Sequence, residues 1–150
     1  MCAFFIGEKM KKILNELSKL VSKASRHREV PVAAVIVHNN KIIAKAYNKR
    51  HNKKQTTSHA EIEAIMKANK KMKSWRLNKC TMFVTIKPCE MCETVIRESR
   101  IDNVYYFVDR LPQKKQYNKT KIKKIENLPD EKFVNNYLEK INVFWKNKRK

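Results

Sequence analysis

The feature that most constrains this chain is a pair of short motifs that must meet in space. The first, at residues 58–61, reads Ser-His-Ala-Glu, and the second, at residues 88–92, reads Pro-Cys-Glu-Met-Cys. Together they form an H-x-E motif followed by P-C-x-x-C. One His and two Cys suit tetrahedral zinc and leave a fourth position open for water, as a catalytic zinc site requires. The chain must therefore fold so that His59, Cys89 and Cys92 come together.

Both motifs are expected at the starts of helices. Pro88 fits the first position of a helix, where its missing N–H costs nothing, and Cys89 and Cys92 then lie on one helical face. The positive end of the helix dipole favours their thiolate forms. His59 and Glu61 open a second helix. We assign Glu61 as the general acid/base that takes a proton from zinc-bound water, passes it to the reacting ring and later protonates the leaving group.

The residues alone leave other interpretations of these motifs open. A C-x-x-C pair can be a redox couple or half of a structural zinc site, and a single His is more often an ordinary core or surface residue. A structural zinc needs a fourth protein ligand, and the remaining cysteines are Cys2 and Cys80. Cys80 precedes a predicted strand and could supply it. Glu61 argues against this alternative, because a structural zinc has no use for that carboxylate.

Length and cysteine usage indicate one cytoplasmic domain that spans residues 1–150. A chain of 150 residues has room for a single core. The chain has four Cys, and the pairing of two in C-x-x-C is typical of metal use in a reducing compartment. No apolar run approaches the ~20 residues of a membrane span. The apolar start lacks the basic region of a signal peptide, so we expect no association with a membrane.

The formal net charge of +21 points to a polyanionic partner, most simply a nucleic acid. Most of the basic residues are Lys, and Asn and Ile are also abundant, so an AT-rich genome would produce the same bias without selection for binding. Lys contacts phosphate as a point charge, without the bidentate fork of Arg. Binding through these residues should therefore be sensitive to salt and weak in sequence preference.

The hydrophobic pattern predicts an alternation of helices and strands. Residues 9–25 carry one apolar face at helical spacing, and residues 32–37 suit a strand that is buried on both faces. The remaining predicted elements are a turn at Asn39 and Asn40, a strand over 41–46, a helix from His59, strands over 80–86 and 102–108, a helix over 89–99, a charged edge strand over 121–125, and a last helix from Pro129 whose aromatic stripe is assigned to a core. This order predicts a three-layer α/β/α fold, with a central mixed five-stranded sheet flanked by helices.

With these residues in view, the chain resembles the bacterial tRNA-specific adenosine deaminase family, within the cytidine deaminase-like superfamily. The zinc signature is common to the zinc-dependent nucleobase deaminases. The tRNA branch is favoured by Glu-Val-Pro-Val and by the Met between the two cysteines. The resemblance covers roughly residues 29–101 and rests on Glu-Val-Pro-Val at 29–32, Ala-Tyr-Asn at 46–48, His-Ala-Glu at 59–61, Phe-Val-Thr at 83–85, Pro-Cys-Glu-Met-Cys at 88–92 and Ser-Arg-Ile at 99–101.

This resemblance implies a cytidine deaminase-like fold, one Zn²⁺ per chain, and a homodimer. It implies the conversion of adenosine to inosine at the wobble position of a tRNA anticodon loop. The residues themselves also allow a deaminase of free cytosine, cytidine or guanine, or a non-enzymatic nucleic-acid-binding module or inactive partner subunit. Carried over position by position, the implied site consists of the zinc ligands His59, Cys89 and Cys92, the proton shuttle Glu61, and the substrate contacts Val32, Asn48, Ala60 and Pro88.

The sequence also departs from the family pattern. Ala33 stands where the family usually has Gly, and Lys87 stands where it usually has Glu. The link from Arg110 to Lys121 is shorter than the family's loop and extra helix. A parallel crossover needs a dozen or more residues, so we expect a hairpin here and an antiparallel last strand. Such a strand is associated with deaminases of free bases and nucleosides, which favours the alternative substrate without changing the zinc chemistry.

Overall fold

The computed structural model describes residues 7–110, 120–126 and 131–148. The chain divides into two units, residues 1–112 and 113–150. The first unit holds the sheet and every predicted site residue. Cys2 and Pro129 lie outside the described residues. No helix in the part of the chain that the structure describes is long and apolar enough to cross a membrane.

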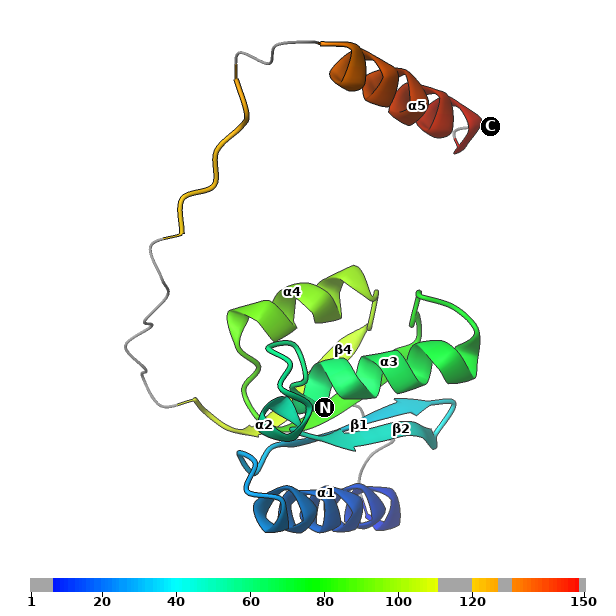
Figure 1. Cartoon of the computed structure of the whole chain (residues 1–150). Helices are drawn as coiled ribbons and strands as arrows, with labels where there is room; N and C mark the ends of the chain where they lie inside the picture. The colour runs from blue at the N-terminus through cyan, green and yellow to red at the C-terminus, as the bar shows by residue number, and fades with distance from the viewer. Residues whose placement is uncertain (1–6, 111–119, 127–130, 149–150) are drawn as a thin grey trace. The chain divides into compact units, whose positions relative to one another are not determined.

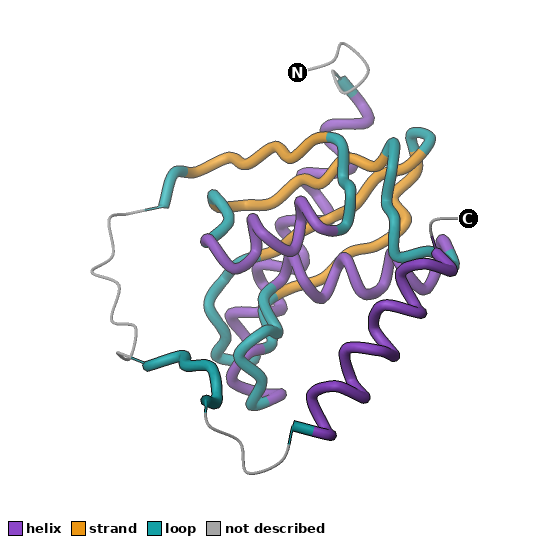
Figure 2. The backbone as a smooth tube through the Cα atoms, turned by 90° about the horizontal axis from the view of Figure 1, so that it is seen from above, coloured by secondary structure: helices purple, strands orange, loops and turns teal. Residues whose placement is uncertain are grey.

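The first unit is organised around a mixed sheet with the strand order β2-β1-β3-β4. β1 pairs antiparallel with both β2 and β3, whereas β3 and β4 are parallel. The four strands run side by side in the view of Figure 2. The mixed α/β sheet that the pattern predicts is therefore confirmed. The strands are β1 (Ala33–His38), β2 (Lys41–Tyr47), β3 (Cys80–Ile86) and β4 (Asn103–Val108).

Helices cover both faces of this sheet, as expected for α/β/α layers. α1 lies on one face, and α3 and α4 lie on the other (Figure 1). Alternate residues of β1 enter two separate cores: Val35 packs with Leu17 of α1, and Ile36 packs with Ile65 of α3. This explains why β1 is apolar along its length. The helices of the first unit are α1 (Glu8–Arg26), α2 (Arg50–Lys53), α3 (Ala60–Met72) and α4 (Glu90–Glu98).

The turn between β1 and β2 is the one that the sequence predicts. His38 is paired with Lys41, so only Asn39 and Asn40 connect the strands. Both residues have positive φ, at 49° and 61°. A two-residue hairpin turn of this kind requires positive φ at both central positions, and Asn tolerates that conformation better than most residues other than Gly. The hairpin pairs β2 with β1, and β2 forms one edge of the sheet.

The prediction of a fifth strand over residues 121–125 is wrong. Residues 120–126 are described and form no strand, so the described residues contain a four-stranded sheet with β4 at its second edge. Ile122 is 93% exposed and Ile125 is 75% exposed. A segment with three lysines and no buried apolar face gains too little on pairing to offset the loss of backbone freedom. The antiparallel last strand expected after the short link is therefore not found either.

The second unit contains one helix among its described residues, α5 (Lys132–Lys148). A last helix is thus confirmed, although its predicted start at Pro129 lies outside the described residues. No residue of α5 is buried. Phe133 and Tyr137 stack on each other along the helix, with ring centroids 6.4 Å apart. The assignment of the aromatic stripe to a core stays a prediction, because one helix alone has no second layer against which to bury it.

Candidate active site

The two sequence motifs lie at the N-termini of α3 and α4. His59 is the N-cap of α3 and Cys89 is the N-cap of α4, and both have extended backbone. The helix starts are thus confirmed, but Pro88 precedes the N-cap and is not the first helical residue as predicted. Cys92 is the third residue of α4. The chain therefore presents the Cys89 side chain where β3 connects to α4 and the His59 side chain where the loop after α2 enters α3.

His59, Cys89 and Cys92 form a compact group of potential metal ligands. Their ligand atoms lie within 4.8 Å of one another. His59 Nδ1 is 3.7 Å from Cys89 Sγ and 3.5 Å from Cys92 Sγ. Zinc bonds of about 2.0 Å to nitrogen and 2.3 Å to sulfur at a tetrahedral angle would separate these atoms by ~3.6 Å. The two separations between His59 Nδ1 and the cysteine sulfur atoms thus match those expected around a tetrahedral zinc ion.

The two thiols of this group differ in acidity. Hydrogen bonds from Cys92 and His59 lower the pKa of Cys89 to about 3. The hydrogen bond to Cys89 raises the pKa of Cys92, and burial adds to this effect. Without a metal, the pair therefore holds one thiolate and shares one proton. A divalent cation replaces that proton, because a metal binds the thiolate form of both cysteines.

Glu61 points its carboxyl group into the same buried region. The residue is 2% exposed and is the second residue of α3. Burial raises the pKa of Glu61, while its backbone hydrogen bond and the charge of His59 act in the opposite direction. The negative charge of Cys89 raises it further. A carboxyl group with a raised pKa can both accept and return a proton near neutral pH, as general acid/base chemistry requires.

Glu29 holds the side chain of Asn48, the predicted nucleotide contact, in place. The Asn48 Nδ2 atom donates to Glu29 Oε2 at 3.1 Å, and both residues are 5% exposed. The same carboxylate accepts from the backbone N–H groups of His51, at 3.2 Å, and Asn52, at 2.7 Å. These N–H groups belong to the first turn of α2. Glu29 thus fixes the orientation of the Asn48 amide and anchors α2 at once.

The end of α1 explains how Glu29 reaches this position. Arg28 has φ of 56°, in the left-handed region. Its N–H donates to the Ser25 oxygen at 3.0 Å, and the N–H of Glu29 donates to the Ala24 oxygen at 3.0 Å. This pair of bonds is the Schellman arrangement that ends many helices. It reverses the chain between α1 and β1 and leaves the Glu29 side chain directed at α2.

Glu63 is a second buried carboxylate beside the site. Lys53 of α2 donates to both of its oxygens, at 2.8 and 2.9 Å. Burial acts to raise the pKa of Glu63, but the hydrogen bonds from Lys53 and Ser58 outweigh it, so the pKa is lowered. This ion pair ties α2 to α3. Glu61 and Glu63 thus have opposite pKa shifts on the same helix.

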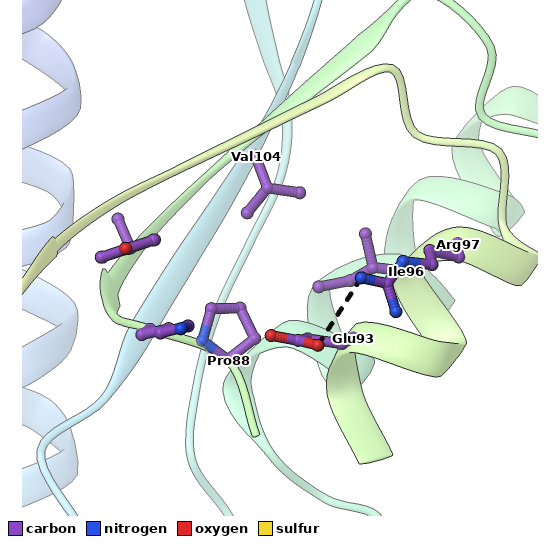
Figure 3. A pocket seen from close by; sticks show the side chains of 7 residues that line it. Pro88, Glu93, Ile96, Arg97 and Val104 are labelled. Atoms are coloured by element: carbon purple, nitrogen blue, oxygen red, sulfur yellow. Dashed lines mark ion pairs between the residues drawn. The ribbon is translucent and has the colours of Figure 1, made fainter. Parts of the chain in front are cut away.

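The structure gives fewer contacts for the other predicted substrate-binding residues, which are Val32, Ala60 and Pro88. Val32 is half-buried, and its carbonyl accepts the Asn48 N–H at 3.0 Å. Ala60 is buried beside His59. Pro88 lines a hollow of about 200 Å³ between α4 and β4. Figure 3 shows the Glu93–Arg97 ion pair across that hollow from Val104. Contact of Val32, Ala60 and Pro88 with a substrate stays a prediction.

Cys80 does not join the ligand group. It starts β3, where it is paired with His38, whereas Cys89 follows the other end of that strand. A strand of seven residues separates the two ends by roughly 20 Å. Burial raises the pKa of the Cys80 thiol, which is typical of a structural core cysteine. A structural zinc completed by Cys80 is therefore excluded by the fold.

Sequence reasoning assigned no role to Glu29 or Glu63. Glu29 is part of the Glu-Val-Pro-Val motif but was not considered as a site residue. A signal was available, because an acidic side chain directly before a buried strand needs partners wherever it is buried. The partners themselves are backbone N–H groups of α2, which no side-chain pattern can identify. Lys53, the partner of Glu63, lies in α2, for which the hydrophobic pattern predicts no helix.

Comparison with known proteins identifies the family to which this arrangement belongs. A model of the MafB19-like deaminase family matches residues 8–150. The chain belongs to this family. The tRNA-specific adenosine deaminase of Bacillus subtilis is 39% identical over 93 residues, which are 62% of this chain and 58% of the relative. That of Streptococcus pyogenes serotype M18 is 41% identical over 97 residues, 65% of this chain and 58% of the relative. The chain thus spans about half to two thirds of these relatives.

Solved structures of deaminases share the fold of this MafB19-like chain. A structure from a study of A-to-I editing by tRNA:A34 deaminases matches with a TM-score of 0.66 and 30% identity, covering 67% of this chain and 78% of the other. Guanine deaminase from Bacillus subtilis matches with a TM-score of 0.60 and 30% identity, covering 63% of each chain. The predicted cytidine deaminase-like fold and the resemblance to tRNA-specific adenosine deaminases are therefore confirmed.

Proposed function

We propose that this protein is a zinc-dependent hydrolytic deaminase that converts adenosine to inosine at the wobble position of a tRNA anticodon. The observation that carries the proposal is the group of His59, Cys89 and Cys92 with the buried carboxyl of Glu61 beside it. Three protein ligands leave one position of a tetrahedral metal for a reactant. A structural zinc would fill that position with a fourth side chain and would have no need of an uncommitted carboxyl group.

His59, Cys89 and Cys92 would hold the zinc ion. When bound, zinc supplies Lewis-acid activation of a water molecule at neutral pH. Glu61 would take a proton from the attacking water and place it on a ring nitrogen. It would then take the remaining proton of the added hydroxyl group and pass it to the amino group, which leaves as ammonia. The raised pKa of Glu61 suits both transfers, because the same group has to release the proton that it has accepted.

Asn48 would position the nucleotide that reacts. One amide hydrogen of Asn48 is committed to Glu29, and a carboxylate can only accept, so the carboxamide oxygen is directed away from Glu29. That oxygen and the second amide hydrogen remain for a base or ribose edge. Because the orientation is fixed before the substrate arrives, little conformational freedom is lost on binding.

An RNA substrate is supported by the relatives and by charge. The curated relatives are tRNA-specific adenosine deaminases, and the chain carries a net charge of +21. A target base in a single-stranded anticodon loop is already unpaired, so the cost of moving it into a pocket is small. A positively charged protein surface adds affinity for RNA without reading its sequence. We further propose that the enzyme is a cytoplasmic homodimer and that residues 1–150 act as one domain.

A free purine base is the second candidate substrate. It is favoured by the likeness to guanine deaminase from Bacillus subtilis, which has the same 30% identity as the tRNA:A34 deaminase structure. The chemistry at Glu61 would be the same, since hydrolytic removal of an exocyclic amino group is common to both substrates. The two candidates differ in whether the cationic surface of the protein takes part.

Mass spectrometry of deamination products tests the proposal. The zinc-loaded protein is incubated with a tRNA transcript that has adenosine at the wobble position and, separately, with guanine, cytosine, cytidine and adenosine. Inosine at the wobble position alone is the expected result. Turnover of a free base or nucleoside alone would replace the tRNA assignment. Absence of turnover on all substrates by a protein with a full complement of zinc would refute the deaminase assignment.

A further inference from the structure

Cations gather along the outer edge of β2, the side of that strand that does not pair with β1. β2 lies between α1 and α3 in Figure 1 and contacts both helices. A shallow hollow of about 400 Å³ opens at this edge. Lys12 and Glu16 line it from α1, residues 42–45 line it from β2, and Lys67 and Lys71 line it from α3. Three separate elements therefore contribute lysines to one depression.

The carboxylate of this hollow does not neutralise it. Glu16 Oε2 is 2.8 Å from the Lys45 Nζ atom, and Lys19 is 3.9 Å from the other oxygen. The hydrogen bond from Lys45 lowers the pKa of Glu16. Lys67 directs its ammonium to the backbone oxygen of Lys45, at 2.9 Å, and not to a carboxylate. Since Glu16 is already paired with Lys45, Lys12 and the α3 lysines leave the hollow with an excess of positive charge.

The cationic surface continues from the hollow to the candidate site. Lys23 Nζ lies 5.6 Å and Lys49 Nζ 5.0 Å from the centroid of the Tyr47 ring. His27 stacks on the same ring, with centroids 5.9 Å apart and planes 10° apart. Tyr47 is followed directly by Asn48. The β2 edge thus leads from the hollow to the residue that we assign to the target nucleotide.

Lys67 connects the two parts of this surface electrostatically. Burial lowers its pKa first, and the charges of Lys49, Lys53 and Lys23 lower it further, while Glu63 acts in the opposite direction. Lysines that are abundant only through genome composition have no reason to remain close, because each exposed side chain can turn away from its neighbours. Here Lys45 is held by Glu16 and Lys67 is held by the Lys45 backbone oxygen, so these two ammonium groups stay at the β2 edge. A polyanion would neutralise the positive charge that remains.

We propose that the β2-edge surface, defined by Lys12, Lys23, Lys45, Lys49, Lys67 and Lys71, binds the sugar–phosphate backbone of the RNA that carries the target base. The inference rests on the proposed function only in taking that substrate to be an RNA. Ammonium groups fix the position of a phosphate backbone without reading bases. The aromatic pair of His27 and Tyr47 adds a surface next to Asn48 on which an unpaired base can stack.

A pair of matched double variants tests the surface. In the first, Lys12→Gln and Lys71→Gln remove two lysines that line the hollow. In the control, Lys11→Gln and Lys70→Gln remove the adjacent lysines of the same two helices, which do not line it. The charge change and the helices are the same in both. Binding of a fluorescent RNA hairpin with an unpaired loop is measured by anisotropy as a function of salt, and thermal unfolding verifies that both variants are folded.

The hollow variant should bind the hairpin about tenfold more weakly than the parent at ~0.1 M salt, and its salt slope should fall by about 1.4 to 1.8, because each phosphate contact contributes about 0.7 to 0.9. The control should differ from the parent by less than about twofold, since it keeps every proposed phosphate contact. Equal binding by the two variants would overturn the inference. So would a parent protein that binds phosphatidylserine vesicles through these lysines but not the hairpin.

Deamination of a hairpin that contains the target adenosine is assayed in parallel. If the hairpin is deaminated and the two variants bind it alike, the proposed function stands and the β2-edge surface is refuted. If the hairpin is not deaminated but the two variants differ in binding as expected, the β2-edge surface stands as an RNA site and the adenosine deaminase assignment fails.

Discussion

The ligand group and the β2-edge surface lie on the same unit but are built on opposite physical principles. His59, Cys89 and Cys92 are brought within 4.8 Å by two helix starts, and the side chains around them are buried and directionally hydrogen-bonded. The lysines of the β2 edge are mostly exposed and act through charge. Short-range bonds in a buried site are nearly independent of salt, whereas exposed charges are screened within about 10 Å at 0.1 M.

This difference predicts how each region should respond to substitutions. Removal of one metal-ligating atom or of the proton-carrying atom should abolish the function of the site completely, because the chemistry depends on the position of that atom. A cationic surface loses affinity in steps, since each lysine contributes a similar and screened share. Single substitutions at the ligand group should therefore have effects far larger than those at the β2 edge, and the effects should not depend on ionic strength.

Loss of a metal ligand should have the largest effect. Cys92→Ala removes one of two thiolates and should reduce bound zinc to a small fraction of one ion per chain, with no measurable turnover. Cys80→Ala is the matched control, because Cys80 is also buried but starts β3 away from the ligand group. It should keep full zinc. The zinc content of both variants is measured by mass spectrometry. Stoichiometric zinc in the Cys92 variant would show that Cys92 is not a zinc ligand.

Removal of the proton carrier, Glu61, should have the second-largest effect on activity. Glu61→Gln keeps the shape of the side chain but cannot transfer a proton, so turnover should fall by about 10² to 10⁴ while zinc and fold are retained. Glu63→Gln changes the other buried carboxylate of α3, which is engaged by Lys53. That control should lower stability and leave turnover within a few fold. Unchanged kcat in the Glu61 variant would refute its role.

Substitution of Glu29, which orients Asn48, should have an intermediate effect on activity. In Glu29→Gln, the amide nitrogen replaces one acceptor and cannot receive both backbone N–H groups and Asn48 Nδ2. An unsatisfied buried donor costs about 1 to 3 kcal/mol, so the melting temperature and kcat/KM should both fall while zinc content stays at the parent value. Asn48→Ala provides the comparison. If the Glu29 variant has normal kcat/KM at a lowered melting temperature, Glu29 supports the fold only.

The ligand group could be predicted from sequence because its signal is local. His59 and Cys89 each stand at a helix start, and the spacing of Cys89 and Cys92 is fixed within one turn. Apart from α2, the elements from residue 8 to residue 108 follow from apolar periodicity for the same reason. The prediction of five strands was wrong at residues 121–125. A segment joins a sheet when it can bury an apolar face on pairing, and this polar segment has no such face. Pro88 was predicted at the first helical position but stands two positions earlier, directly before the N-cap Cys89, since Pro is accepted both before and at a helix start.

What could not be predicted depends on contacts between distant segments. Glu29 meets α2 because a Schellman turn reverses the chain after α1, and its partners are backbone groups without a sequence signature. The β2-edge surface could be anticipated only as a net charge. Which lysines come together is decided by the packing of α1 and α3 on either side of β2. Both features therefore became visible only when the fold was known.

The smallest expected effect is a pH dependence that the Lys53–Glu63 pair contributes. The pKa of Glu63 is lowered in the folded chain, so the pair stabilises the fold above the unfolded pKa of about 4.3 and loses that contribution as pH falls through the folded pKa. Lys53 is 41% exposed, so solvent screening limits the loss in Lys53→Met to about 0.5 to 1 kcal/mol at pH 7.

Urea unfolding of the parent and the Lys53→Met variant at a series of pH values measures this contribution. The difference in unfolding free energy should be constant from pH 8 to about 6 and should shrink below a pH of about 4.3, because the unfolded chain takes up a proton at Glu63 before the folded chain does. Lys54→Met, one residue further along the loop, is the control and should show no such trend. A difference that persists undiminished at pH 3 would mean that Lys53 stabilises α2 through packing of its side chain, and that Glu63 is not its electrostatic partner.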